Sequence, residues 1–150
     1  MEEGLAMSDW LIPYINFNGN CEEAVKFYQS AIGGETQILH YKDAPANPDF
    51  PISEGSQNLV LHAELRKDGH VIRFADNFPG TPFSKGNAIS FALELPTAEE
   101  TRRIFTALSQ EGEVEMDLQE TFFSPLYAKF TDKFGVHWQL HCKKSGPFST

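Results

Sequence analysis

The sequence predicts an α+β fold in which two βαβββ modules together form a cupped mixed sheet. Three observations support this prediction. Residues 20–32 and 97–108 each have the apolar spacing of an amphipathic helix. One strand pattern precedes each helix and three follow it, and the second copy begins about 77 residues after the first. Such self-similarity indicates an internal repeat, which takes priority over other interpretations of the chain.

The two predicted helices share their start signals. Asn20 and Thr97 are the expected N-cap residues, and Glu23 and Glu100, three positions later, complete the pattern of a capping box. Acidic residues occupy the first turn and a glycine follows the last turn in both copies, as the helix dipole and C-cap preferences favour. The same chemistry is therefore expected at both helix starts.

The strands and connections divide the chain into two halves of one domain, residues 1–150. The first module is expected at 10–78, the connector at 79–87 and the second module at 88–143. A proline-rich segment, 43–55, is expected to form a long loop inside the first module. The expected strands are 10–18, 36–41, 58–66 and 70–77 in the first module, and 87–95, 113–118, 126–130 and 136–142 in the second.

A two-residue Asp-Gly turn at Asp68-Gly69 determines the expected pairing of the central hairpin of the first module. One face of this hairpin is apolar and is expected to pack against the helix, and the other is polar. The pairs expected on the polar face are Arg66 with Val71, Glu64 with Arg73, and His62 with Ala75.

The second module shows the same alternation. In its last strand Trp138 and Leu140 alternate with polar residues, and the strand 87–95 places Ile89 and Phe91 on one side and Ser90 on the other. Polar faces opposite the helices are the surfaces on which a small molecule is expected to bind. The candidate ligand-binding residues are His62, Glu64, Arg73, Ser90, His137, Gln139 and His141; no catalytic residue is identified.

Composition and charge exclude several classes of function. The 150-residue chain has 12 Lys and Arg against 21 Asp and Glu, a formal net charge of −9. This balance disfavours nucleic acids and anionic membranes as partners. No apolar run is long enough to span a bilayer. Met1–Gly4 does not begin a signal peptide, and the two cysteines lack a metal-binding spacing, so a cytoplasmic protein with reduced thiols is expected.

Four local strings resemble the PhnB-like branch of the vicinal oxygen chelate superfamily, which includes glyoxalase I, extradiol dioxygenases, and bleomycin and fosfomycin resistance proteins. The strings are PYINFNGN at 13–20, EAVKFY at 23–28, HAEL at 62–65 and DKFGVHWQ at 132–139. Their order and spacing carry the resemblance over residues 10–143. It implies the glyoxalase/bleomycin resistance/dioxygenase fold and a homodimer, with or without exchange of modules between chains.

The resemblance also implies four metal-ligand positions, which this chain does not fill with suitable donors. They fall at Pro13, Arg73, Ala88 and Gln139. Proline and alanine have no side-chain donor and arginine repels a cation, so only Gln139 retains an oxygen ligand. We therefore expect no metal and no other cofactor, and a small-molecule-binding protein that acts as a cytoplasmic homodimer.

Two alternatives stay open. One is a metal-dependent lyase, isomerase, dioxygenase or transferase that uses His62, Glu64, His137 or Gln139 in a non-standard site. The other is a structural or regulatory partner protein. Arg73 has two readings as well, as an anion-binding residue or as the ion-pair partner of Glu64. No methyl-donor site or phosphonate-binding motif is present in the sequence, which leaves the ligand and the question of catalysis open.

Overall fold

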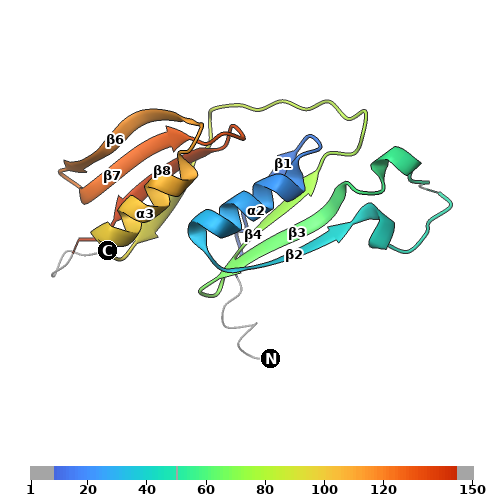
Figure 1. The fold of residues 1–150 in the computed structure, drawn as a ribbon, viewed down its shortest axis with the longest axis horizontal. Coiled ribbons are helices and arrows are strands. Elements are labelled where there is room, and N and C mark those ends of the chain that lie inside the picture. The colour runs from blue at the N-terminus through green and yellow to red at the C-terminus, as the bar shows by residue number, and fades with distance from the viewer. Residues whose placement is uncertain (1–8, 50, 145–150) are drawn as a thin grey trace. The chain divides into compact units, whose positions relative to one another are not determined.

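A computed structural model describes residues 9–49 and 51–144 (Figure 1). Met1–Gly4, on which the expectation about a signal peptide rests, lies outside the described residues. The first module contains β1 (Tyr14–Phe17), α2 (Cys21–Ile32), β2 (Glu35–His40), β3 (Val60–Lys67) and β4 (His70–Asp76). The second contains β5 (Phe91–Leu95), α3 (Ala98–Leu108), β6 (Glu113–Thr121), β7 (Ser124–Thr131) and β8 (His137–Cys142).

The two modules have the same strand topology, which confirms the α+β class and the βαβββ repeat. The sheet orders are β1-β4-β3-β2 and β5-β8-β7-β6. In each sheet the first strand is parallel to the last strand of its module and the other pairs are antiparallel, so both sheets are mixed. The chain divides into two compact units between Phe83 and Ser84, and each is described by itself.

The central hairpin of the first module has the predicted register. Arg66 pairs with Val71 and Glu64 with Arg73. The described ladder ends at Ala63↔Phe74, one residue before the expected pair His62–Ala75. The Asp-Gly turn therefore determined which side chains share a face, because a shift of one residue would have exchanged the two faces.

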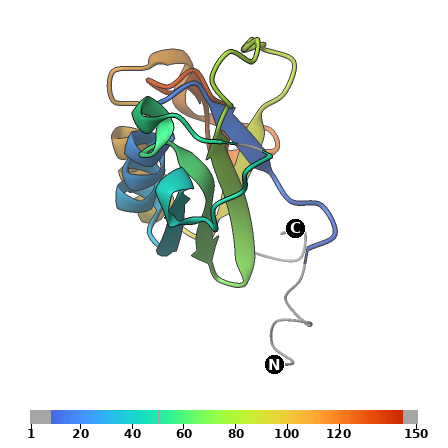
Figure 2. The same ribbon diagram turned by 90° about the vertical axis from the view of Figure 1, so that its right-hand side faces the viewer.

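Each module buries one helix face against its own sheet. In the first, α2 contacts β2, β3 and β4 (Figure 2), and the ring of Tyr28 stacks on Phe74 with 5.9 Å between centroids. In the second, α3 contacts β5, β7 and β8, and Phe105 meets Phe130 edge-on at 5.6 Å. Each module also buries one free cysteine, which is Cys21 in the first and Cys142 in the second.

The first strand of each module begins later than predicted. Pro13 precedes β1 and has no N–H to donate, and Trp10, further upstream, is 94% exposed. The predicted strand 87–95 begins only at Phe91, because its partner β8 begins at His137 and pairs Phe91 with Trp138. The expectation that Ile89 faces the apolar side of the strand is therefore wrong, and Ile89 is 72% exposed.

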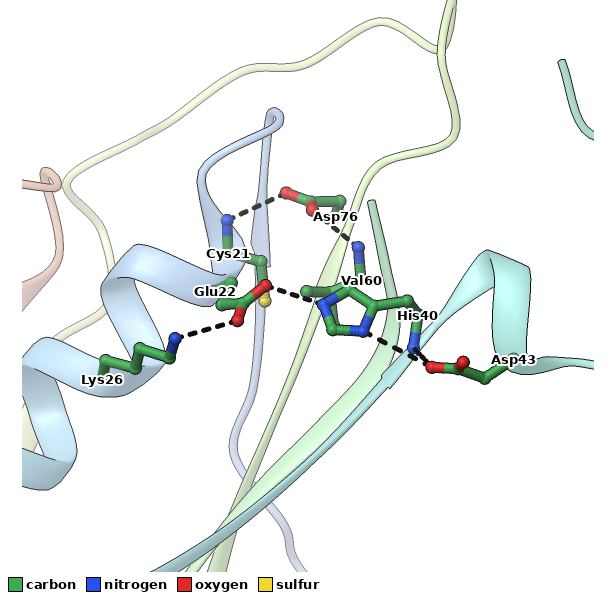
Figure 3. A network of polar contacts seen from close by, with 7 residues as sticks. All are labelled: Cys21, Glu22, Lys26, His40, Asp43, Val60 and Asp76. Carbon is green, nitrogen blue, oxygen red and sulfur yellow. Dashed lines mark hydrogen bonds and ion pairs between the residues drawn. The ribbon is translucent and has the colours of Figure 1, made fainter. Parts of the chain in front are cut away.

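The predicted capping of the first helix is also wrong. Asn20 occupies the N-cap position but its side chain makes no capping hydrogen bond. Instead Asp76, buried at the end of β4, accepts hydrogen bonds from the backbone N–H of Gly19 at 2.8 Å and of Cys21 at 3.0 Å. Its second oxygen accepts from Val60 N–H at 2.9 Å (Figure 3). At the second helix the N-cap part of the prediction is confirmed, since Thr97 Oγ1 accepts from Glu100 N–H at 3.1 Å.

Candidate functional site

The candidate residues fall into two sets, one in each module, and Ser90 lies directly before β5. His62, Glu64 and Arg73 belong to the first module, and the other four, Ser90, His137, Gln139 and His141, belong to the second.

In the first module a polar row crosses all four strands. Tyr14 lies opposite Arg73, Arg73 opposite Glu64, and Glu64 opposite Gln37. Side chains alternate between faces along a strand, so this row lies on the face away from the buried Phe74 and α2. The register thus brings four neutral or charged hydrogen-bonding groups onto one line.

Glu64 is the centre of the row. Its side chain is only 14% exposed, and its two oxygens accept from Arg66 Nε at 3.0 Å and from Arg73 Nε at 3.2 Å. His62 Nε2 lies 3.5 Å from the same carboxylate. Burial raises the pKa of Glu64, but the charge of Arg66 and the contact with His62 outweigh it, and the net effect is a lowered pKa. Glu64 is therefore a carboxylate at neutral pH, and it forms the expected ion pair with Arg73 through Nε.

Tyr14 is a site residue that the sequence did not single out. Its hydroxyl lies 3.3 Å from Nδ1 of His62, and the two rings are 6.0 Å apart. Alternation along β1 predicts its face, but only the parallel pairing with β4 places it beside Arg73. The local pattern of the sequence carries no information about that pairing.

In the second module Gln139 connects two hydroxyl groups. Tyr127 Oη donates to Gln139 Oε1 at 2.6 Å, and Gln139 Nε2 donates to Ser90 Oγ at 2.8 Å. Burial and, less strongly, the charge of Glu115 raise the pKa of Tyr127, which keeps the phenol protonated and able to donate. Tyr127 was not among the candidates, and its position follows from pairing with His141 in the β7–β8 ladder.

The two histidines of β8 have different environments. His137 is hydrogen-bonded at both ring nitrogens, with Thr131 Oγ1 2.8 Å from Nδ1 and the Gly86 carbonyl oxygen 2.9 Å from Nε2. His141 lies against the ring of Phe123, with 6.0 Å between centroids. His137 is therefore held in place by its own module, whereas His141 belongs to an aromatic patch with Phe123 and Tyr127.

A second polar network joins α2 to the start of the long loop (Figure 3). His40 Nε2 lies 2.7 Å from Glu22 Oε1, and His40 Nδ1 lies 3.4 Å from Asp43 Oδ2. Lys26 Nζ contacts the other oxygen of Glu22 at 3.0 Å. The bonds from His40 and Lys26 lower the pKa of Glu22. This network attaches the 3-10 turn Tyr41–Asp43 to the helix, which is a structural role.

The residues at the family's metal positions do not fit a divalent ion. Pro13 and Ala88 offer no side-chain donor, and the guanidinium of Arg73 is a cation. The oxygen of Gln139 already accepts the bond from Tyr127. Within residues 9–49 and 51–144 no group of three or more His, Cys, Asp or Glu side chains is arranged to hold a metal.

Comparison with known proteins places these sites in a family. Residues 9–141 match the family model described as 3-demethylubiquinone-9 3-methyltransferase. Protein YjdN of Escherichia coli K12 is 32% identical over 91% of this chain and 97% of its own length. The crystal structure of PA1353 from Pseudomonas aeruginosa is also 32% identical, with a TM-score of 0.82 over 92% of this chain and all of that chain.

Two further structures extend the comparison. A PhnB protein from Bacillus cereus is 27% identical with a TM-score of 0.70, covering 89% of this chain and 99% of its own. A glyoxalase family protein from Enterococcus faecalis, 19% identical with a TM-score of 0.55 over 89% of this chain and 97% of its own, shows the shared fold. Among the described residues no helix has the length and apolar character needed to cross a membrane. The family match over residues 9–141 establishes that this chain belongs to the 3-demethylubiquinone-9 3-methyltransferase family, with a PhnB protein among its relatives and the fold of the glyoxalase family protein.

Proposed function

We propose that this protein binds a small organic molecule on the polar, helix-free faces of its sheets and does so without a metal ion. The observation that carries the proposal is the row Tyr14–Arg73–Glu64–Gln37, which crosses the first sheet on the face away from α2. Convergent polar groups on a partly apolar surface are typical of ligand sites.

The metal-free part of the proposal rests on the donors. His137 uses both ring nitrogens within its own module, and Glu64 is neutralised by two arginines. Binding a cation would require these contacts to break first. The residues that remain are suited to hydrogen bonding and charge pairing with an organic ligand.

Metal analysis tests this part directly. The protein is produced in medium supplemented with zinc, nickel, manganese and iron, and the bound metal is measured by elemental analysis. We expect less than stoichiometric metal. One metal per chain that is lost in a His137→Ala variant would instead support the metal-dependent enzyme, and a His70→Ala variant, which removes an exposed histidine of the other module, serves as the control.

The assembly state and location complete the proposal. We propose a cytoplasmic homodimer, in line with the PhnB-like family, and light scattering coupled to gel filtration should give twice the 16.9 kDa chain mass at micromolar concentration. A mass of one chain at every concentration would contradict the dimer. The family description names a methyltransferase. We do not extend that activity to this chain because its sequence contains no methyl-donor site, and we expect a titration with S-adenosylmethionine to show no binding.

A thermal-shift screen of small molecules tests ligand binding itself. A ligand at 100 times its Kd adds about 2.7 kcal/mol to the free energy of unfolding, which is a readily measured shift. Hits are checked by protein-observed NMR, where amide signals of β1, β3 and β4 should respond. A screen in which hits perturb only signals outside the two sheets would contradict the proposal.

A further inference from the structure

The Arg73 guanidinium is bonded to Glu64 through one of its three nitrogens. Arg73 Nε donates to Glu64 Oε2 at 3.2 Å, but within the described part of the chain no hydrogen bond or ion pair uses Nη1 or Nη2. A guanidinium has five N–H donors in one plane, and four of them are on the two Nη atoms. Within the described residues these four donors are left for a ligand or for water.

Glu64 fixes the orientation of these donors. Its carboxylate, 14% exposed, bonds the Nε side of Arg73, so the plane of the guanidinium is held from one side. Arg73 itself is 35% exposed and sits on a central strand between Tyr14 and Glu64. An arginine held in this way binds a second oxyanion in the fork of its Nη atoms with little loss of side-chain entropy.

From this geometry we infer that the face binds the oxyanion group, such as a carboxylate, of a small molecule through Nη1 and Nη2 of Arg73. The inference rests on the proposed function and names the chemical class of the ligand. Tyr14, opposite Arg73 in the β1–β4 ladder, and His62, beside the Glu64 carboxylate, add two aromatic rings and the Tyr14 hydroxyl to this face. An aromatic carboxylate matches all of these groups.

Arg66 provides the matched control. It bonds the same carboxylate through the same atom, Nε, at 3.0 Å, and it lies on the same face. However, Arg66 is 59% exposed and lies opposite Glu35 in the β2–β3 ladder, whose negative charge opposes an anion. An anion bound at this face should therefore depend on Arg73 much more than on Arg66.

The test is a set of NMR titrations of the full-length protein with sodium benzoate, benzamide and inorganic phosphate at low ionic strength. We expect benzoate to shift amide signals of β1, β3 and β4 and benzamide to shift them much less. Arg73→Gln should weaken benzoate binding at least tenfold, and Arg66→Gln less than about threefold. Added salt should weaken benzoate binding to the wild type. Arg73→Lys, which keeps the charge beside Glu64, should also weaken binding because it lacks the planar fork.

The phosphate arm separates the two sources of the oxyanion. Shifts with benzoate alone indicate an organic carboxylate, and shifts with phosphate that need Arg73 indicate a phosphoryl group. Equal effects of Arg73→Gln and Arg66→Gln, or equal binding of benzoate and benzamide, overturn the inference while the small-molecule function stands. If neither benzoate nor phosphate shifts any signal and no neutral compound stabilises the protein in the thermal-shift screen, both the oxyanion inference and the small-molecule function are overturned.

Discussion

The two modules share one topology but hold their helices in different ways. The N-terminus of α2 is held by Asp76, whose carboxylate accepts hydrogen bonds from the N–H groups of Gly19 and Cys21. These two residues precede Asp76 by 57 and 55 positions in the chain. The N-terminus of α3 is held by Thr97, three residues from its partner. The buried carboxylate of the second module, Asp132, does not lie at a helix start. It accepts hydrogen bonds at the β7–β8 connection, from Phe134 N–H at 2.8 Å and from the Trp138 indole N–H at 2.8 Å.

This difference teaches that one capping signal in sequence can have two outcomes. Asn20 and Thr97 both have the residue type and spacing of an N-cap, and only Thr97 caps. A buried carboxylate from β4 reaches the first helix start and satisfies its N–H groups, which leaves Asn20 without that role. Tertiary contacts therefore override a local preference that is worth about 1 kcal/mol.

Replacement of Asp76 is expected to give the largest effect. Asp76→Ala removes the acceptor of three backbone N–H groups and leaves those of Cys21 and Val60 buried without a partner. We expect a loss of about 3–4 kcal/mol in the free energy of unfolding, since each unsatisfied buried donor costs roughly 1–3 kcal/mol. Urea denaturation followed by circular dichroism measures it. A loss below 1 kcal/mol would show that the helix start does not depend on this carboxylate.

The two N-cap residues give the sharpest comparison. Thr97→Ala should cost about 1 kcal/mol because it removes the acceptor of Glu100 N–H. Asn20→Ala, at the equivalent position, should cost less than about 0.5 kcal/mol because its side chain makes no capping bond. Both are measured by the same urea titrations. Equal losses would mean that Asn20 caps α2 in solution after all.

Acid should weaken the first module through Glu64, and this effect is expected to be the smallest. Because the pKa of Glu64 is lower in the folded chain than the ordinary value of 4.5, its ionised form stabilises the folded state above about pH 4.5. That contribution to stability is lost as the pH falls from 4.5 to below the pKa that Glu64 has in the folded chain. Urea denaturation at pH 6 and at pH 3.5 should show a difference between the wild type and Glu64→Gln that shrinks at the lower pH. If the difference in free energy of unfolding between wild type and Glu64→Gln is the same at both pH values, the ion pairs of Glu64 are not its cause.

Much of the fold could be predicted because its signals are local. The Asp68-Gly69 turn determined the pairing of Glu64 with Arg73, and alternation along the strands assigned faces to Gln139 and its neighbours. The beginnings of β1 and β5 could not be predicted, since they depend on where distant partner strands begin. The same limit applies to the site.

Alternation identified the charged residues of the first sheet, but not the groups beside them. Tyr14 reaches Arg73 through a parallel pairing between strands almost 60 residues apart, and Tyr127 reaches Gln139 through the β7–β8 register. The parallel pairing has no turn signal of its own in the sequence, whereas the β7–β8 pairing has one in the turn Asp132–Gly135, where Gly135 has a positive φ. The distances that distinguish a ligand site from a solvated strand face therefore come only from the folded chain.

The two buried cysteines give each module an internal reporter of its own opening. The thiolate is the form that attacks alkylating reagents, and burial, together with the negative charges of Asp76 and Glu22, raises the pKa of Cys21. Cys21 and Cys142 lie in different modules and are both inaccessible in the folded state. The rate at which iodoacetamide modifies each of them therefore measures the free energy of opening for each half of the repeat separately, in the unmodified native protein.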